Sequence, residues 1–170
     1  MLSFNDFSSA LPKMPVLPPN AKSEQAEDLI PQTKNARRVP LVMIYSSDAD
    51  IRLMFRTALE IWGFAALEAE TAENAIELAG RFRPDLVLMD SELILFRSLS
   101  SMRIMQNNKA FEKAPFVLLS GHAQKNIRNI ALAAGAADFL VKPVNLDVLE
   151  VVLKSRLEQI ERKPESEEFR

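Results

Sequence analysis

Short apolar runs alternate with helical patterns along the chain from Pro40 onward. Each run is continuous rather than alternating, which is typical of strands that are covered on both faces. The runs are LVMIY (41–45), the weaker AALEA (65–69), LVLM (86–89), FVLL (116–119) and DFLV (138–141). Strands that alternate with helices in this way predict repeated βα units around a parallel sheet.

The segments between the runs place apolar residues at helical spacing. Thr71 and Asn145 are suited to cap the second and fifth helices, and Gly63 and Gly135 follow the first and fourth. The third helix, within 97–109, has the weakest pattern. These elements predict a doubly wound (βα)5 α/β sandwich of three layers. The residues expected to face the core are Ile51, Met54, Phe55, Ala58, Leu59 and Trp62, then Ala72, Ala75, Ile76, Ala79 and Phe82, then Ile127, Ile130, Ala131 and Ala134, and finally Leu149, Val152, Leu153, Leu157 and Ile160. The opposite face of the first helix carries Arg52, Arg56 and Glu60.

Prolines concentrate in the first part of the chain. Six of the ten prolines lie between Pro12 and Pro40, among polar and charged residues without a sustained apolar period. Such a segment buries too little apolar surface to offset the entropy of ordering it. We therefore predict a disordered, proline-rich arm over residues 1–39, one domain over residues 40–162 and a charged tail over residues 163–170.

Composition narrows the classes of partner. The net charge is −2 with a pI near 5.6, so no bulk charge attracts nucleic acid or an anionic membrane. The chain has no cysteine, which removes disulfides, thiolate metal sites and cysteine nucleophiles. No apolar run approaches the roughly 18 residues that a membrane span needs. We predict a soluble cytoplasmic protein that binds neither nucleic acid nor membrane.

Polar residues follow the apolar runs at the place where a parallel sheet binds its ligands, beyond the carboxyl ends of its strands. At those ends stand Ser46 and Ser47, Asp90, Ser120 and Lys142. We expect a carboxylate, a hydroxyl and an ammonium group to converge on one edge of the sheet. Together, in this order, they are a stronger signal than any one of them alone.

Three motifs in these regions resemble the receiver domain of two-component response regulators. They are RPDLVLMD (83–90), APFVLLSG (114–121) and AGAADFLVKPVNLDVL (134–149). The resemblance runs from about residue 40 to about residue 160. It implies a flavodoxin-like receiver fold with the parallel strands in the order 2-1-3-4-5.

The resemblance also implies roles for the residues at the strand ends. Asp90 would be the phosphoacceptor, Ser120 the switch hydroxyl that bonds the phosphoryl group, and Lys142 the cation that pairs with it. Phe139 occupies the rotating aromatic position, and the bond from Lys142 to Pro143 would be cis. The chemistry is coherent, since a carboxylate that attacks phosphorus needs positive charge and a donor nearby.

The first departure from the family lies at Ser46 and Ser47, where the family places an acidic pair that holds Mg²⁺ together with the phosphoacceptor. Mg²⁺ is normally held by carboxylates and water, so two neutral hydroxyls cannot replace the lost charge. Asp48 falls at the start of a helix and Glu92 at a position where the family uses a backbone carbonyl, so neither is well placed to substitute. We expect Mg²⁺ binding to be weak or absent, and no other cofactor or metal.

A second departure follows Asp90, where SELILFRSL (91–99) replaces the family's Met-Pro-x-Met-Asp-Gly-like loop. The missing proline and glycine leave the conformation of this loop open. The apolar residues of ELILF (92–96) fit either a docking patch or buried core, and both interpretations stay open.

Each of these residues also has a purely structural interpretation. SDAD (47–50) fits a capping box with Ser47 as the cap. Asp90 and Lys142 would then form an internal ion pair that fixes the edge of the sheet without any catalysis. Phe139 would be ordinary core, which is the more frequent role of a phenylalanine in a buried strand.

Two functions remain. The first is an atypical stand-alone receiver that acts through protein–protein contacts, with weak or absent Mg²⁺-dependent phosphorylation at Asp90. The alternative is a phosphoaccepting single-domain response regulator in a phosphorelay, since a leading arm and a short tail leave no room for an output domain. An enzyme is not expected, because no second carboxylate or base histidine follows the strands, and His122 is expected to be solvated. The partner is either a sensor kinase or a downstream signalling protein, and a homodimer stays open.

Deletion of residues 1–39 should leave the melting temperature nearly unchanged, because the arm lacks a periodic apolar face. Thermal unfolding of the full chain and of the shortened chain, followed by circular dichroism, measures this. A large drop would mean that the arm packs on the domain.

Overall fold

A five-stranded parallel sheet forms the centre of the computed structural model, which describes residues 38–91 and 95–161. The strand order is β2-β1-β3-β4-β5, which confirms the predicted topology. All neighbouring strands pair in parallel. The strands are β1 Leu41–Tyr45, β2 Ala65–Ala69, β3 Leu86–Ser91, β4 Phe116–Ser120 and β5 Asp138–Val141.

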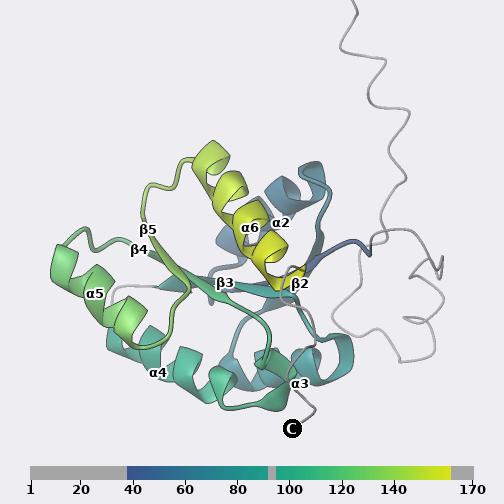
Figure 1. Ribbon diagram of the computed structural model, residues 1–170, viewed down its shortest axis with the longest axis horizontal. Coiled ribbons are helices and arrows are strands. Elements are labelled where there is room, and N and C mark those ends of the chain that lie inside the picture. Colours follow the sequence, from purple (N-terminus) through teal and green to yellow (C-terminus); the bar gives the residue numbers. More distant parts are fainter. Residues whose placement is uncertain (1–37, 92–94, 162–170) are drawn as a thin grey trace, which may run out of the picture. The chain divides into compact units, whose positions relative to one another are not determined.

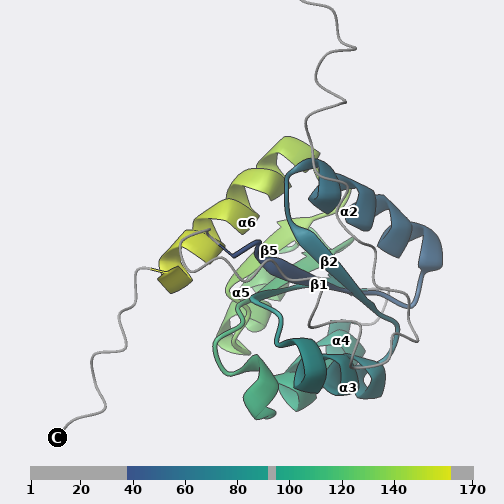
Figure 2. The same cartoon turned by 90° about the vertical axis from the view of Figure 1, so that its right-hand side faces the viewer.

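Helices cover both faces of this sheet, as the continuous apolar runs predicted. One apolar cluster lies between the sheet and α2 and α6, and the other lies between the sheet and α3, α4 and α5. Figures 1 and 2 show the same two helical layers on opposite sides of the strands. The helices are α2 Ala49–Ile61, α3 Ala72–Phe82, α4 Leu95–Gln106, the short 3-10 helix η1 Lys109–Phe111, α5 Lys125–Ala133 and α6 Leu146–Glu161.

The core-facing stripes are narrower than the apolar periodicity predicted. Met54 of α2 is 48% exposed and Ile130 of α5 is 40% exposed, so neither is a core residue. In α2 the buried stripe is centred on Phe55, Ala58 and Leu59, and Met54 lies on its flank. An apolar residue at the border of a stripe satisfies the helical period and still faces solvent.

The start of α2 corrects the capping prediction by one residue. Asp48, not Ser47, is the N-cap, and its Oδ1 accepts hydrogen bonds from the N–H groups of Asp50 at 2.8 Å and Ile51 at 3.2 Å. A carboxylate at this position satisfies two otherwise unpaired donors and carries a charge that the helix N-terminus favours. Ser47 is exposed, and the adjacent Ser46 is buried.

The remaining caps lie where the sequence placed them. Thr71 Oγ1 accepts from Asn74 N at the start of α3, and Asn145 Oδ1 accepts from the N–H groups of Asp147 and Val148 at the start of α6. Gly63 and Gly135 follow α2 and α5 with φ of +82° and +101°, where a side chain would be strained. At both glycines the chain turns sharply into the next strand.

One carboxylate ties the edge strand β5 to a helix of each layer. Asp138 Oδ1 lies 3.5 Å from Arg128 Nη2 of α5, and Asp138 Oδ2 lies 3.0 Å from Arg156 Nη2 of α6. The backbone of Phe139 is engaged beside it. Its N–H donates to Asp138 Oδ1 at 2.8 Å, and its carbonyl accepts from Arg128 Nη1 at 2.6 Å.

Several sequence predictions fall on residues outside the described ones. They are the predictions for the arm up to residue 37, for residues 92–94 of ELILF and for the charged tail. The three domain boundaries therefore remain predictions. Within residues 38–91 and 95–161, no helix is long and apolar enough to span a membrane.

Replacing the α2 cap by Asp48→Ala should lower the free energy of unfolding by about 1 kcal/mol, because two helix donors lose their acceptor. Asp48→Asn is the matched control, since its amide oxygen still accepts and should retain most of the stability. Urea unfolding followed by the fluorescence of Trp62 measures both. Equal stability of the alanine and asparagine variants would contradict the cap.

Candidate functional site

The site lies at the carboxyl edge of the sheet and is centred on Asp90. This residue is next to last in β3, the central strand, and is 4% exposed. Ser120 ends β4, Ser46 follows β1, and Lys142 follows β5. Because parallel strands end at the same edge, the topology brings these residues of different sequence regions together.

An ion pair joins Asp90 to Lys142. Lys142 Nζ contacts Asp90 Oδ1. The lysine side chain is 29% exposed and the carboxylate side chain only 1%, so the charge that is withdrawn from water is that of Asp90. Its cation reaches it from the solvent side. The Lys142–Pro143 peptide bond is cis, and Lys142 N donates to the carbonyl of Ser120 at 2.8 Å.

The second oxygen of Asp90 is held by Ser46. Ser46 Oγ donates to Asp90 Oδ2 at 3.0 Å, and the same Oγ accepts from the N–H of Asp48 at 3.2 Å. Ser46 is 1% exposed, so this bond is shielded from water. One of the two serines at the predicted metal position is therefore a direct partner of the candidate phosphoacceptor.

Ser120 and Phe139 belong to β4 and β5, and neither is among the partners of Asp90 described above. Ser120 is fully buried, and its Oγ accepts from the N–H of His122 at 3.2 Å, within the loop that follows β4. Phe139 is 1% exposed and belongs to the apolar cluster under α3, α4 and α5. This position supports the core interpretation of Phe139, and its role as a rotating aromatic remains a prediction.

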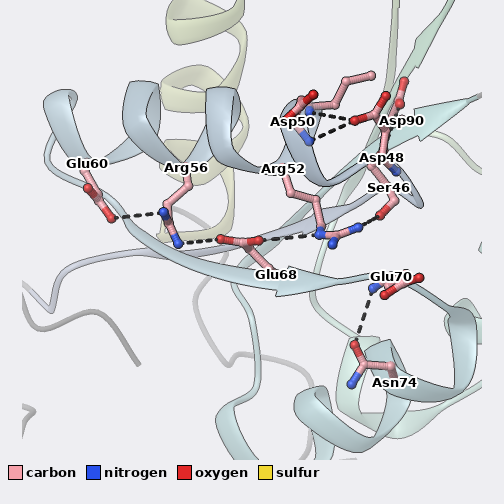
Figure 3. Close-up of polar contacts among 11 residues, drawn as sticks. Ser46, Asp48, Asp50, Arg52, Arg56, Glu60, Glu68, Glu70, Asn74 and Asp90 are labelled. Atoms are coloured by element: carbon pink, nitrogen blue, oxygen red, sulfur yellow. Dashed lines mark hydrogen bonds and ion pairs between the residues drawn. The ribbon is translucent and has the colours of Figure 1, made fainter. Parts of the chain in front are cut away.

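Arg52 is a residue of the site that the sequence pattern assigned to the solvent face of α2. Its side chain is only 14% exposed. Arg52 Nη1 donates to the carbonyl of Ser46 at 2.6 Å, and its Nε lies 3.4 Å from Glu68 Oε2 of β2. Figure 3 shows Glu60, Arg56, Glu68, Arg52 and Ser46 as one row of polar contacts along α2 and β2.

A signal for this row exists in the sequence. Arg52 and Arg56 stand four residues apart and so share one face of the helix, while Glu68 is the charged residue in the otherwise apolar run AALEA. A charged residue in a strand beside a helix with two arginines indicates an ion pair between the two elements.

The oxygen atoms beside Asp90 that could bind a metal ion are mostly neutral. Among the described residues, no group of three or more His, Cys, Asp or Glu side chains is placed to hold a metal ion. The positions where the family places its acidic pair carry the hydroxyls of Ser46 and Ser47, and Lys142 already contacts one oxygen of Asp90.

Comparison with known proteins points to one family. A family model described as the response regulator receiver domain matches residues 42–154. The chain is 30% identical over 116 residues to the KDP operon transcriptional regulatory protein KdpE of Escherichia coli (strain K12), covering 68% of this chain and 50% of that protein. It is 27% identical over 117 residues to the regulatory protein AtoC of the same strain, covering 69% and 25%. A response regulator structure from Thermotoga maritima matches with a TM-score of 0.62 at 28% identity, covering 71% of this chain and 98% of that one.

The match has the extent of one domain. This chain spans half of the length of KdpE and a quarter of the length of AtoC, whereas it spans nearly all of the Thermotoga maritima chain.

Lys142→Met should lower the free energy of unfolding by about 2 kcal/mol, because the buried carboxylate of Asp90 would lose its cation. The partial exposure of the lysine keeps this figure below that of a fully buried pair. Adding Asp90→Asn to this variant removes the unpaired charge and should recover about half of the loss. Urea unfolding measures all three proteins, and a Lys142→Met variant as stable as the wild type would contradict the pairing.

Proposed function

Because this chain belongs to the family of response regulator receiver domains, we propose that it is an atypical receiver that signals through protein–protein contacts. In this proposal Mg²⁺-dependent phosphorylation at Asp90 is weak or absent. The observation that carries it is the hydrogen bond from Ser46 Oγ to Asp90 Oδ2, at the place where the family holds a metal. A neutral hydroxyl supplies one donor to the carboxylate and no positive charge.

The donor set does not fit Mg²⁺. Mg²⁺ prefers octahedral oxygen coordination and sheds its water reluctantly, so carboxylates must repay the loss of hydration. In the part of the chain that the structure describes, Asp90 belongs to no group of three or more metal-ligating side chains, and its two oxygens already contact Lys142 and Ser46. A metal would have to displace the Ser46 hydroxyl and compete with the Lys142 ammonium.

Phosphoryl transfer to Asp90 is expected to be slow for the same reason. The transferred group carries negative charge that preorganised cations and donors must stabilise. Lys142 supplies one positive charge at Asp90. Ser120 Oγ accepts from His122 N, which leaves its O–H as the donor that a phosphoryl oxygen would use. Without a metal, this step would lack the charge stabilisation that a divalent cation supplies.

The alternative function is a phosphoaccepting response regulator receiver. It is favoured by the presence of Asp90, Ser120 and Lys142 together at the carboxyl edge of the sheet. Under this alternative Asp90 accepts the phosphoryl group, Ser120 bonds it and Lys142 pairs with it. The two functions make opposite demands on Asp90, because a receiver that accepts phosphate must release the contact with Ser46.

The partner is a protein under both functions. Receiver domains interact with sensor kinases and with other signalling proteins, and we propose one of these two classes for this chain. KdpE is named a transcriptional regulatory protein, and this chain matches half of its length, so a role in transcription does not transfer with the match.

Wild-type protein should show no saturable response to millimolar Mg²⁺, whereas Ser46→Asp combined with Ser47→Asp should restore affinity by supplying two carboxylates beside Asp90. The same double variant should be less stable without metal, because three carboxylates would crowd around one lysine. NMR titration, or the fluorescence of Tyr45 and Trp62, measures the affinity.

Adding Asp90→Asn to the double variant is the control, and it should weaken the restored site. Wild-type saturation at millimolar Mg²⁺ would contradict the proposal. Rapid Mg²⁺-dependent labelling of Asp90 by a small phosphodonor, detected by mass spectrometry, would favour the phosphoaccepting alternative.

A further inference from the structure

Every polar atom of Ser46 is engaged in a hydrogen bond. Its N–H donates to the carbonyl of Ala69 at 3.1 Å, and its Oγ donates to Asp90 and accepts from Asp48 N. Its carbonyl accepts from Arg52 Nη1 at 2.6 Å. A residue that is bonded at its N–H, its carbonyl and its hydroxyl has little freedom to rotate its side chain away from Asp90.

Among the hydrogen bonds of Ser46, the one from Arg52 to its carbonyl does not follow from the pairing of the strands. β1 ends at Tyr45, so the carbonyl of Ser46 lies beyond the strand. A guanidinium donor to a carbonyl is charge-assisted and therefore stronger than the neutral bonds of Ser46 to Ala69 and Asp48. Arg52 lies in the first turns of α2, which places its side chain back toward the end of β1.

Glu68 fixes the direction of the guanidinium group. Its Oε2 lies 3.4 Å from Arg52 Nε, while its Oε1 lies 2.8 Å from Arg56 Nη1. Arg52 therefore uses one nitrogen for Glu68 and another for Ser46. A lysine offers a single ammonium at the end of a flexible stem and cannot make both contacts in the same geometry.

We propose that Arg52 is a positioning residue, which holds the carbonyl of Ser46 so that the Ser46 hydroxyl stays on Asp90. Glu68 orients Arg52. Through Arg52, helix α2 determines whether the Ser46 hydroxyl stays bonded to the carboxylate of Asp90, which α2 itself does not contact. The inference rests on the proposed function in one respect, since it takes the Ser46 hydroxyl rather than a metal as the resident partner of Asp90.

Two local probes in the full-length chain report the position of the Ser46 hydroxyl without metal or phosphodonor. The N–H of Asp48 donates to Ser46 Oγ, so its hydrogen-exchange rate rises when that oxygen moves. The ¹³Cγ resonance of Asp90 responds to loss of the bond to its Oδ2. Ser46→Ala removes the hydroxyl and defines the full effect on both probes.

Arg52→Gln should speed exchange of the Asp48 N–H by about tenfold relative to the mean change of the other α2 amides, as expected for loss of one charge-assisted bond. It should also move the Asp90 ¹³Cγ resonance toward its position in Ser46→Ala. Arg52→Lys, which retains the charge, should give most of the same effect. Arg56→Gln is the matched control, because Arg56 binds Glu68 but not Ser46, and it should leave both probes near their wild-type values.

The double variant Arg52→Gln with Ser46→Ala separates positioning from general loosening of the helix. If Arg52 acts through Ser46, the double variant should match Ser46→Ala alone on both probes. An undiminished effect of Arg52→Gln without the Ser46 hydroxyl, or equal effects of Arg52→Gln and Arg56→Gln, would overturn the inference. Strong Mg²⁺ binding by the wild type would overturn the proposed function instead, and these metal-free measurements would still decide the role of Arg52.

Discussion

A buried negative charge in the middle of the sheet is the constraint around which the rest of this edge is arranged. Asp90 lies on the central strand with 4% exposure, where a carboxylate without partners would be strongly unfavourable. Lys142 supplies the cation from β5 and Ser46 supplies a donor from β1, so the ends of three strands must keep a fixed relation to one another. The apolar layers below hold that relation, because strands that are covered on both faces cannot slide without exposing core.

The fold was predictable because its strands are apolar on both faces and its helices have clear caps. Thr71, Asn145, Gly63 and Gly135 mark element ends through local chemistry that does not depend on the rest of the chain. Met54 was predicted wrongly because the helical period identifies a stripe but not its edges, which depend on how the helix sits on the sheet. The N-cap is Asp48 rather than Ser47 for a related reason. Two good capping residues are adjacent in the sequence, and tertiary contacts determine which of them caps the helix.

The positions of the candidate site residues were predictable, and their contacts were less so. Strand ends identify Asp90, Ser120 and Lys142 without any knowledge of side-chain conformation. The contact between Ser46 and Asp90 requires the side-chain direction at the end of β1, which the sequence does not contain. Arg52 was not predicted as a site residue, because helical periodicity assigns any charged residue on the polar face of a helix to solvent. A long side chain at the flank of that face can nevertheless reach back to a strand end.

The contacts at Asp138 also have a meaning for the open side of the sheet. An edge strand presents N–H and C=O groups to which a strand of another molecule could pair, and such pairing leads to aggregation. In β5 the N–H of Phe139 is bonded by Asp138 and its carbonyl by Arg128, so a strand that approached this edge would first have to break both bonds. The same side chains that join β5 to the two helical layers therefore oppose the addition of a strand at Phe139 of this edge.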